Sequence, residues 1–139
     1  MRTWIRYFFD PLVCLLGGLS MKVSEIVKLL NCEICVDCGD LGREVHSACG
    51  ADMMSDVLAF VKEQSVLLTG LVNPQVVRTA EMMDMRCIVF VRGKQPDENL
   101  LGLARESGII VLKTKERMYQ ACGILYMNGL RGGEPCSQK

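Results

Sequence analysis

The chain has 139 residues, 16 basic and 16 acidic side chains, and an apolar fraction of 50%. This length and apolar content suit one compact domain and are too small for two independent cores. The formal net charge of +0 provides no overall positive field for a nucleic-acid backbone, so nucleic acid is not an expected partner. Composition predicts a globular domain and indicates no reaction.

Residues 1–20 differ in composition from the rest of the chain. They hold Trp4, Tyr7, Phe8 and Phe9, which are four of the eight aromatic residues. Their apolar stretch is broken by Asp-Pro and Gly-Gly pairs and falls short of the ~20 residues that span a bilayer, so we expect no stable membrane insertion. We interpret the segment as an upstream extension or a misassigned start. A signal or membrane-surface anchor and a packed structural segment are the alternatives.

Readable periodicity begins at Met21. Apolar residues at i, i+3, i+4 and i+7 predict a helix over 23–30, with Ser24 as its cap and Asn31 as its end. Two short extended pieces are expected at 33–36 and 44–48, separated by a glycine-containing turn.

A second amphipathic helix is expected to start at Met54, capped by Asp52. Three short apolar runs then recur at a spacing of about 22 residues, at 65–69, 87–91 and 109–113. Runs of this kind are typical of buried parallel strands.

Helical patterns separate the three runs, and capping residues mark their limits. Asn73-Pro74 and Pro96-Asp97 predict helix starts, and Gly108 predicts a helix end. A last helix is expected to begin near Thr114. Alternating strands and helices predict a small layered α/β domain with a mainly parallel sheet and flanking helices. We place that domain at 21–127 and expect a flexible tail over 128–139.

Ligands of parallel α/β sheets bind at the carboxyl ends of the strands, near helix N-termini that attract anions. The loops at this edge predict a site for a small anionic or nucleotide-like ligand; its candidate residues are Thr69, Gly70, Asn73, Arg92, Gly93, Lys94 and Thr114. The alternative is that the edge consists of ordinary solvated loops. The glycine patterns of nucleotide triphosphatases and dinucleotide dehydrogenases are absent from the sequence, which disfavours both classes.

The sharpest local pattern is Cys32-x-x-Cys35-x-x-Cys38, followed by Cys49. Thiolates at such spacing bind iron-sulfur clusters or zinc, so a metal site is one alternative. A strand over 33–36, however, would point Cys32 and Cys35 to opposite faces. We therefore favour reduced thiols in a cytoplasmic protein, with no metal or other cofactor.

Several segments together resemble a DRTGG domain over about residues 21–133. They are 52–58, 66–70, 73–77, 87–93 with Pro96, and 108–114. The resemblance implies a fold similar to the N-terminal domain of HPr kinase/phosphorylase. It also implies a regulatory or dimer-forming role, of the kind these domains have in phosphotransacetylases and beside CBS domains in pyrophosphatases. Stand-alone copies of this length resemble those encoded near iron hydrogenase and electron-transfer components in anaerobic bacteria.

The chain departs from the family pattern at its name-giving positions. Val72 and Asn73 occupy the place of the Asp-Arg pair, and Val91-Arg92-Gly93 replaces Thr-Gly-Gly. The phosphate-binding kinase half of HPr kinase has no counterpart in the sequence, so the resemblance implies no kinase activity.

The hypothesis we favour is a non-catalytic regulatory or interaction module. We expect it to be a homodimer that binds a small ligand and a protein partner in a regulatory or electron-transfer system. The sequence shows no nucleophile or acid-base pair, and His46 stands alone. The alternative is a redox or iron-sulfur accessory protein that uses the cysteine motif, and a small-molecule enzyme comes third.

Overall fold

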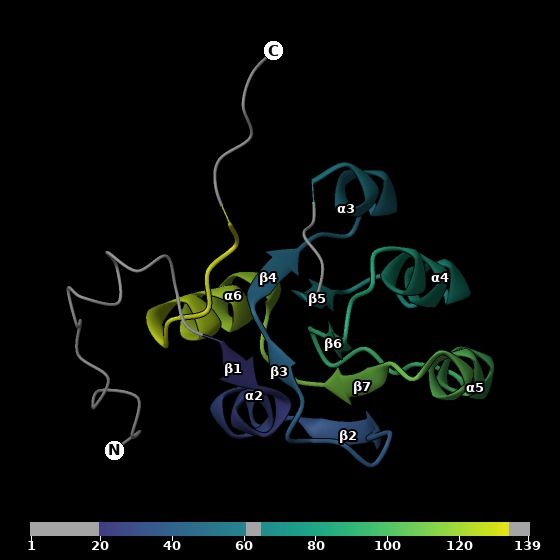
Figure 1. Cartoon of the computed structure of the whole chain (residues 1–139), viewed down its shortest axis with the longest axis horizontal. Coiled ribbons are helices and arrows are strands. Elements are labelled where there is room, and N and C mark those ends of the chain that lie inside the picture. Colours follow the sequence, from purple (N-terminus) through teal and green to yellow (C-terminus); the bar gives the residue numbers. More distant parts are fainter. Residues whose placement is uncertain (1–19, 61–64, 134–139) are drawn as a thin grey trace.

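The structure is a computed structural model, and it describes residues 20–60 and 65–133. A five-stranded sheet with the order β2-β7-β6-β5-β4 forms its centre (Figure 1). The four strands from β4 to β7 are parallel, and β2 pairs antiparallel with β7 at one edge. The strands are β2 (Glu33–Val36), β4 (Ser47–Gly50), β5 (Ser65–Thr69), β6 (Cys87–Phe90) and β7 (Ile110–Lys113). This arrangement confirms the predicted α/β class.

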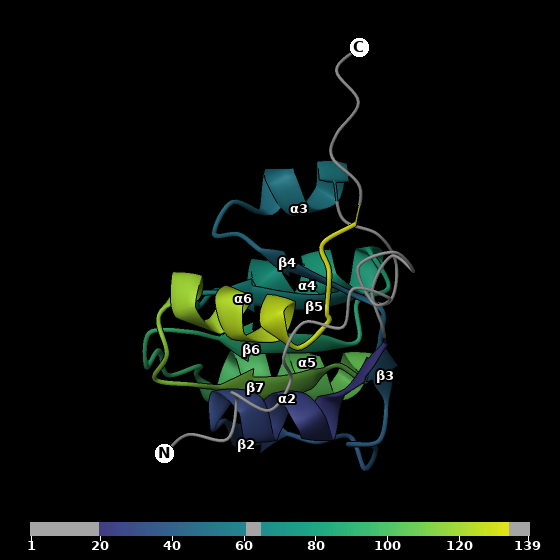
Figure 2. The same ribbon diagram turned by 90° about the vertical axis from the view of Figure 1, so that its left-hand side faces the viewer.

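Helices cover both faces of the sheet (Figures 1 and 2). One face is covered by α2 (Val23–Leu30) and α6 (Met118–Met127). The other is covered by α3 (Met54–Phe60), α4 (Pro74–Met82) and α5 (Glu98–Ser107). A separate two-stranded ribbon pairs β1 (Met21–Lys22) with β3 (Glu44–Val45).

The central strands are apolar along their whole length because both of their faces are buried. In β5, Val66 and Leu68 enter the core under α2 and α6, whereas Leu67 enters the core under α4 and α5. The strands β6 and β7 alternate in the same way. Burying each such side chain contributes about 1.5–3 kcal/mol, so the two cores hold the strand ends in fixed positions.

Capping residues fix most helix ends as predicted. The Asn73 side chain accepts a hydrogen bond from the Gln75 amide, and Asp97 accepts one from Leu100. Asn31 and Gly108 end their helices in the left-handed conformation, with φ values of 50° and 68°.

The predicted cap Ser24 is wrong. Lys22 holds the N-cap position, because the helix begins one residue before Ser24. The last helix also begins later than predicted, at Met118 and not near Thr114.

The extended piece predicted at 44–48 is two strands. β3 ends at Val45, and β4 begins at Ser47 and joins the main sheet as a fourth parallel strand.

The first residues of the expected tail pack on the domain. Leu130 is 1% exposed within the core beside α2 and α6, and the Arg131 carbonyl oxygen accepts a hydrogen bond from the Ala48 amide at 3.0 Å. The Arg131 guanidinium also lies over the Tyr126 ring at 3.8 Å. The expectations for residues 1–19 and 134–139 fall outside the described residues. Within the described ranges, no helix has the length and apolar character needed to cross a membrane.

Candidate functional site

The carboxyl ends of the four parallel strands lie side by side, and the candidate residues lie in the loops that follow three of them. Asp52 follows β4, Gly70 follows β5 and Arg92 follows β6. Since these three strands are neighbours in the sheet, the three residues meet at one edge. The site therefore depends on sheet register, which the buried strands hold fixed.

The Asp52 carboxylate is the centre of this group. Its Oδ1 accepts hydrogen bonds from the Gly70 amide at 2.8 Å and from the Thr69 hydroxyl at 3.2 Å. Its Oδ2 pairs with Arg92 Nη2 at 3.3 Å. Three hydrogen-bond donors, a backbone amide, a hydroxyl and a guanidinium, thus converge on one carboxylate. Donors of these kinds bind carboxylates and phosphates in proteins.

The Arg92 backbone holds the guanidinium over the end of β5. Arg92 has a φ of 61°, and its amide donates to the Glu116 carbonyl oxygen at 2.8 Å. A Cβ at Gly70 would lie 1.9 Å from Arg92 Nη2, so only glycine leaves space for the guanidinium in this position. Few side chains adopt the left-handed conformation, and its strain at Arg92 persists because the neighbouring loop fixes the backbone.

The charges of the pair stabilise one another in a solvent-accessible setting. The pKa of Asp52 lies below its ordinary value, chiefly because the Gly70 amide donates a hydrogen bond to the carboxylate. Hydrogen bonds from Arg92 and Thr69 lower this pKa further, whereas partial burial raises it. The side chains of Arg92 and Asp52 are 40% and 48% exposed. Exposed ion pairs are weak, so this pair contributes little to the stability of the fold.

The structure brings only part of the predicted residue set together. Thr69, Gly70 and Arg92 converge as expected, and the exposed Gly93 and Lys94 continue the Arg92 loop. The Asn73 side chain caps α4. Thr114 is buried, and its hydroxyl donates to the Leu30 carbonyl oxygen at 2.7 Å.

Asp52 is the residue that the predicted set lacks. Its place at the edge depends on β4 being a parallel strand of the main sheet, and residues 44–48 give too short an apolar signal to predict that. The sequence pattern assigns Asp52 to the cap of α3 instead. In the structure, the Met53 carbonyl oxygen accepts the hydrogen bonds of the Asp56 and Val57 amides at the start of α3, and the Asp52 side chain instead binds Gly70, Thr69 and Arg92.

The cysteine motif does not converge. Cys32 packs under α2 and α6, whereas Cys35 packs on the opposite face of the sheet, as the strand pattern predicts. Cys38 is exposed in the turn after β2, and Cys49 lies on β4 at the other edge of the sheet. Across residues 20–60 and 65–133, no three Cys, His, Asp or Glu side chains are grouped as a metal ion requires.

Burial raises the pKa of all four motif thiols, that of Cys32 to about 12. These thiols are therefore protonated at neutral pH, whereas metals and nucleophilic chemistry use thiolates. The geometry weighs against the motif as a metal centre, and protonated thiols are weak nucleophiles for redox chemistry.

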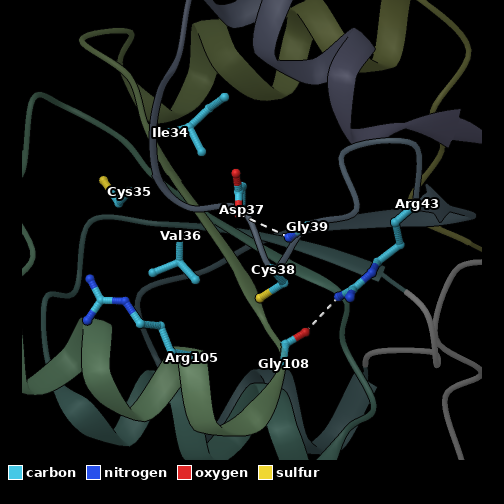
Figure 3. A pocket seen from close by; sticks show the side chains of 9 residues that line it. All are labelled: Ile34, Cys35, Val36, Asp37, Cys38, Gly39, Arg43, Arg105 and Gly108. Carbon is cyan, nitrogen blue, oxygen red and sulfur yellow. Dashed lines mark hydrogen bonds between the residues drawn. The ribbon is translucent and has the colours of Figure 1, made fainter.

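An open pocket of about 620 Å³ lies along β2, away from the strand ends (Figure 3). Cys35 and Cys38 line it together with Arg43 and Arg105. Arg43 donates from Nη1 to the carbonyl oxygens of Arg86 at 3.2 Å and Gly108 at 2.7 Å. The pocket thus contains two guanidinium groups, one of which is held by the backbone.

The model of the family described as DRTGG domain matches residues 25–126. The chain belongs to the DRTGG domain family. No curated protein matches the sequence. A similar solved structure is the crystal structure of the CBS and DRTGG domains of the regulatory region of Clostridium perfringens pyrophosphatase, complexed with its activator, diadenosine tetraphosphate. The TM-score is 0.65 at 15% sequence identity, over 88% of this chain and 53% of that chain.

This DRTGG domain shares its fold with that regulatory region and spans about half the length of the solved chain. Arg92 has a φ of 61°, which glycine adopts freely and other residues rarely do. In this member, the strained position carries the guanidinium that binds Asp52.

Proposed function

We propose that this DRTGG domain is a non-catalytic regulatory module that binds a small phosphate-bearing ligand at the carboxyl edge of its sheet. The observation that carries the proposal is the binding of the Asp52 carboxylate by the Gly70 amide, the Thr69 hydroxyl and Arg92. The donors are already oriented, and a phosphate group offers them the same kind of charged oxygen acceptors.

The surroundings favour a small ligand. Lys94 is exposed in the loop that carries Arg92. Lys113, at the end of β7, already pairs with Glu33 at 3.0 Å, so it supplies less free charge to the edge. The positive potential is therefore local, which suits a nucleotide or a phosphate ester better than a polyanion. Diadenosine tetraphosphate, the activator in the similar regulatory region, belongs to this chemical class.

Calorimetric titration of the full chain with inorganic phosphate, adenosine monophosphate and diadenosine tetraphosphate tests the site. Arg92→Ala removes the guanidinium, and Arg105→Ala is the matched control because Arg105 is also half-exposed and ion-paired, with Glu98 at 3.7 Å. We expect Arg92→Ala to weaken binding about tenfold, since one charged hydrogen bond contributes about that much. Equal binding by the wild type and both variants would reject the site.

The non-catalytic part of the proposal is tested with the same three probes. Phosphorus NMR of each probe, incubated with the full chain, should show unchanged signals over many hours. A new phosphorus signal that Arg92→Ala abolishes would instead identify an enzyme.

We propose that the module acts as a homodimer through the outer face of α6. Residues 118–130 contain no charged side chain. On this face Tyr119 is 87% exposed, and Tyr126 and Met127 are also exposed. A Cβ at Gly123 would meet nothing within 4 Å, so there is open space above this glycine. The helix therefore presents exposed tyrosines next to a position that can receive a side chain. The helix itself brings no charge to this face, and its one described cation is Arg131, whose guanidinium lies over the Tyr126 ring. Tyrosines beside an open position can pair with the same features of a second copy under two-fold symmetry, which favours a second copy as the partner.

Light scattering on the full chain measures this association. Tyr119→Lys should convert a dimer into a monomer, because two lysines would then face one another in an apolar contact. Met82→Lys is the control, since Met82 is 74% exposed on α4, on the other face of the sheet. A wild-type monomer, or equal effects of both variants, would contradict the α6 interface.

The wider setting that we propose is cytoplasmic, with a protein partner in a regulatory or electron-transfer system. Its support is the family resemblance to stand-alone DRTGG proteins, together with the six free thiols of the described residues. Affinity capture from anaerobic lysate with the wild type and with Tyr119→Lys would test it. The proposal requires a captured protein to be an electron-transfer or regulatory component.

A further inference from the structure

The same carboxylate that reveals the site also occupies it. Asp52 belongs to the chain, and its Oδ1 already accepts the hydrogen bond of the Gly70 amide at 2.8 Å. A phosphate oxygen cannot accept the same hydrogen bond without displacing Oδ1. Two anions that share these donors would also repel one another in the absence of a further cation.

Displacing Asp52 would act on α3, because only Met53 separates the two. The helix is short, running from Met54 to Phe60, and it packs mainly on α4. Among the side chains that the structure describes over 53–59, Met54 and Val57 are buried, whereas Met53 and Leu58 are 64% and 42% exposed. An element with few buried side chains opens more readily than the core.

The Asp52 contacts therefore hold one end of a weakly packed helix. Ala51 continues the sheet pattern, its amide donating to the Leu68 carbonyl oxygen at 3.1 Å, so the chain is fixed up to that residue. Beyond it, the contacts of the Asp52 side chain tie the connection to β5 and β6. Losing them would free the start of α3 and leave the sheet intact.

We propose that Asp52 is an internal competitor for the anion site, and that ligand binding displaces it and releases α3. This inference rests on the proposed ligand site and adds its regulation. Ligand binding at the carboxyl ends of the strands would thereby change the surface of α3, and a partner protein could recognise that change. The free protein is in the closed state, with the carboxylate bound, and the ligand shifts the population toward the released state.

Competition of this kind lowers the apparent affinity by the factor that favours the closed state. Removing the competitor should therefore tighten binding, whereas removing a contributing residue weakens it. This opposite sign separates a competing carboxylate from one that helps to hold the ligand.

The test is an NMR titration of the full chain with inorganic phosphate at constant ionic strength. We expect Asp52→Asn to bind phosphate about tenfold more tightly than the wild type, within the usual range of coupling between sites. Asp56→Asn is the matched control, because it removes the same charge from the first turn of α3, while the Gly70 amide donates to Asp52. We expect it to change affinity less than about twofold, as a screened surface charge does.

Amide hydrogen exchange supplies the second measurement. Saturating phosphate should speed exchange in α3 of the wild type, while exchange in β5 and β6 stays unchanged. In Asp52→Asn, exchange in α3 should be fast before phosphate is added and should respond little to it. Asp52→Ala should behave as Asp52→Asn does, which guards against a new hydrogen bond from the asparagine amide.

The outcomes separate this inference from the proposed function. If Arg92→Ala binds phosphate as well as the wild type, the ligand site itself is wrong. If binding needs Arg92 but Asp52→Asn binds no more tightly than Asp56→Asn, the ligand site stands and the competitor is overturned. If Asp52→Asn binds more tightly while exchange in α3 never changes, the competitor stands and the release of α3 is overturned.

Discussion

Arg43 and Arg92 are both guanidinium groups at the margin of the sheet, yet the structure uses them differently. Arg43 is 17% exposed in its side chain and donates to two backbone carbonyl oxygens, those of Arg86 and Gly108, and its Nε lies 3.6 Å from the exposed Asp40 carboxylate. Arg92 is 40% exposed and pairs with the carboxylate of Asp52, which is itself half-exposed.

The difference lies in whether the partner can leave. The carbonyl oxygens that Arg43 binds belong to the backbone at the start of β6 and the end of α5, so they hold the guanidinium in place whether or not the Asp40 carboxylate stays paired with it. The partner of Arg92 is a side chain on a loop, which under our proposal rotates away when another anion binds. A cation in a pocket is therefore a poor guide to a ligand unless its present partner is exchangeable.

The largest effect that we expect is on stability, from Arg43→Ala. The change removes charged hydrogen bonds to two carbonyl oxygens in the half-buried region between α5 and β6, and should cost about 2–3 kcal/mol in the free energy of unfolding. Urea denaturation measures this cost. Arg105→Ala, in the same pocket, should cost less than about 0.5 kcal/mol because its ion pair is exposed. Equal costs for the two variants would break the comparison.

Thr114 extends the comparison to a second committed group at the strand ends. Its hydroxyl donates to the Leu30 carbonyl oxygen and accepts from the Glu116 amide. Thr114→Val keeps the shape but leaves both backbone groups without this partner, so we expect a loss of about 1–2 kcal/mol. Phosphate affinity should stay within about twofold of the wild type, a change that corresponds to less than 0.5 kcal/mol. A large loss of affinity at unchanged stability would make Thr114 a ligand residue after all.

Acid should weaken the exchangeable pair and leave the committed one intact. The folded-state pKa of Asp52 is lowered, chiefly by the Gly70 amide. Its contribution is therefore present above the unfolded pKa and is lost as pH falls through the folded value, in a window that begins near pH 4. Because the group is half-exposed, we expect less than about 1 kcal/mol. The difference in unfolding free energy between wild type and Asp52→Asn should shrink below this pH, and a constant difference would contradict the assignment.

Arg92→Gly should have the smallest effect on stability. Glycine relieves the left-handed strain, which costs about 1–2 kcal/mol, while the lost exposed ion pair contributes up to about 1 kcal/mol. The net change should lie near zero or be slightly stabilising in thermal melts, although phosphate binding falls as in Arg92→Ala. A substantially destabilised variant would mean that the guanidinium serves the fold, as that of Arg43 does.

The sequence predicted the central sheet well because its signals are local. Apolar runs identify β5, β6 and β7, and Asn73, Asp97 and Gly108 each act through a hydrogen bond or a φ value of their own segment. The position of the candidate site at the carboxyl ends of the strands could also be predicted, because parallel strands place these ends together.

Asp52 could not be predicted because its role depends on pairing between distant segments. The short strand β4 has only a weak apolar pattern, and its neighbour β5 begins 15 residues after β4 ends, at Ser65. Arg43 is similar, because its two carbonyl partners lie 43 and 65 residues away. Such contacts are set by tertiary packing and leave no periodic signal in the sequence.

The hydrogen bond between the Ala48 amide and the Arg131 carbonyl oxygen covers part of the outer side of β4. Strand edges that are left open recruit strands from other molecules and promote aggregation. The family match ends at residue 126, before this contact and before the buried Leu130. A protein trimmed to the matched region would therefore lose the buried Leu130 side chain and expose more of the β4 edge to pairing with other molecules. The residues after α6, through Arg131, are thus needed in any minimal version of this domain that is to resist aggregation.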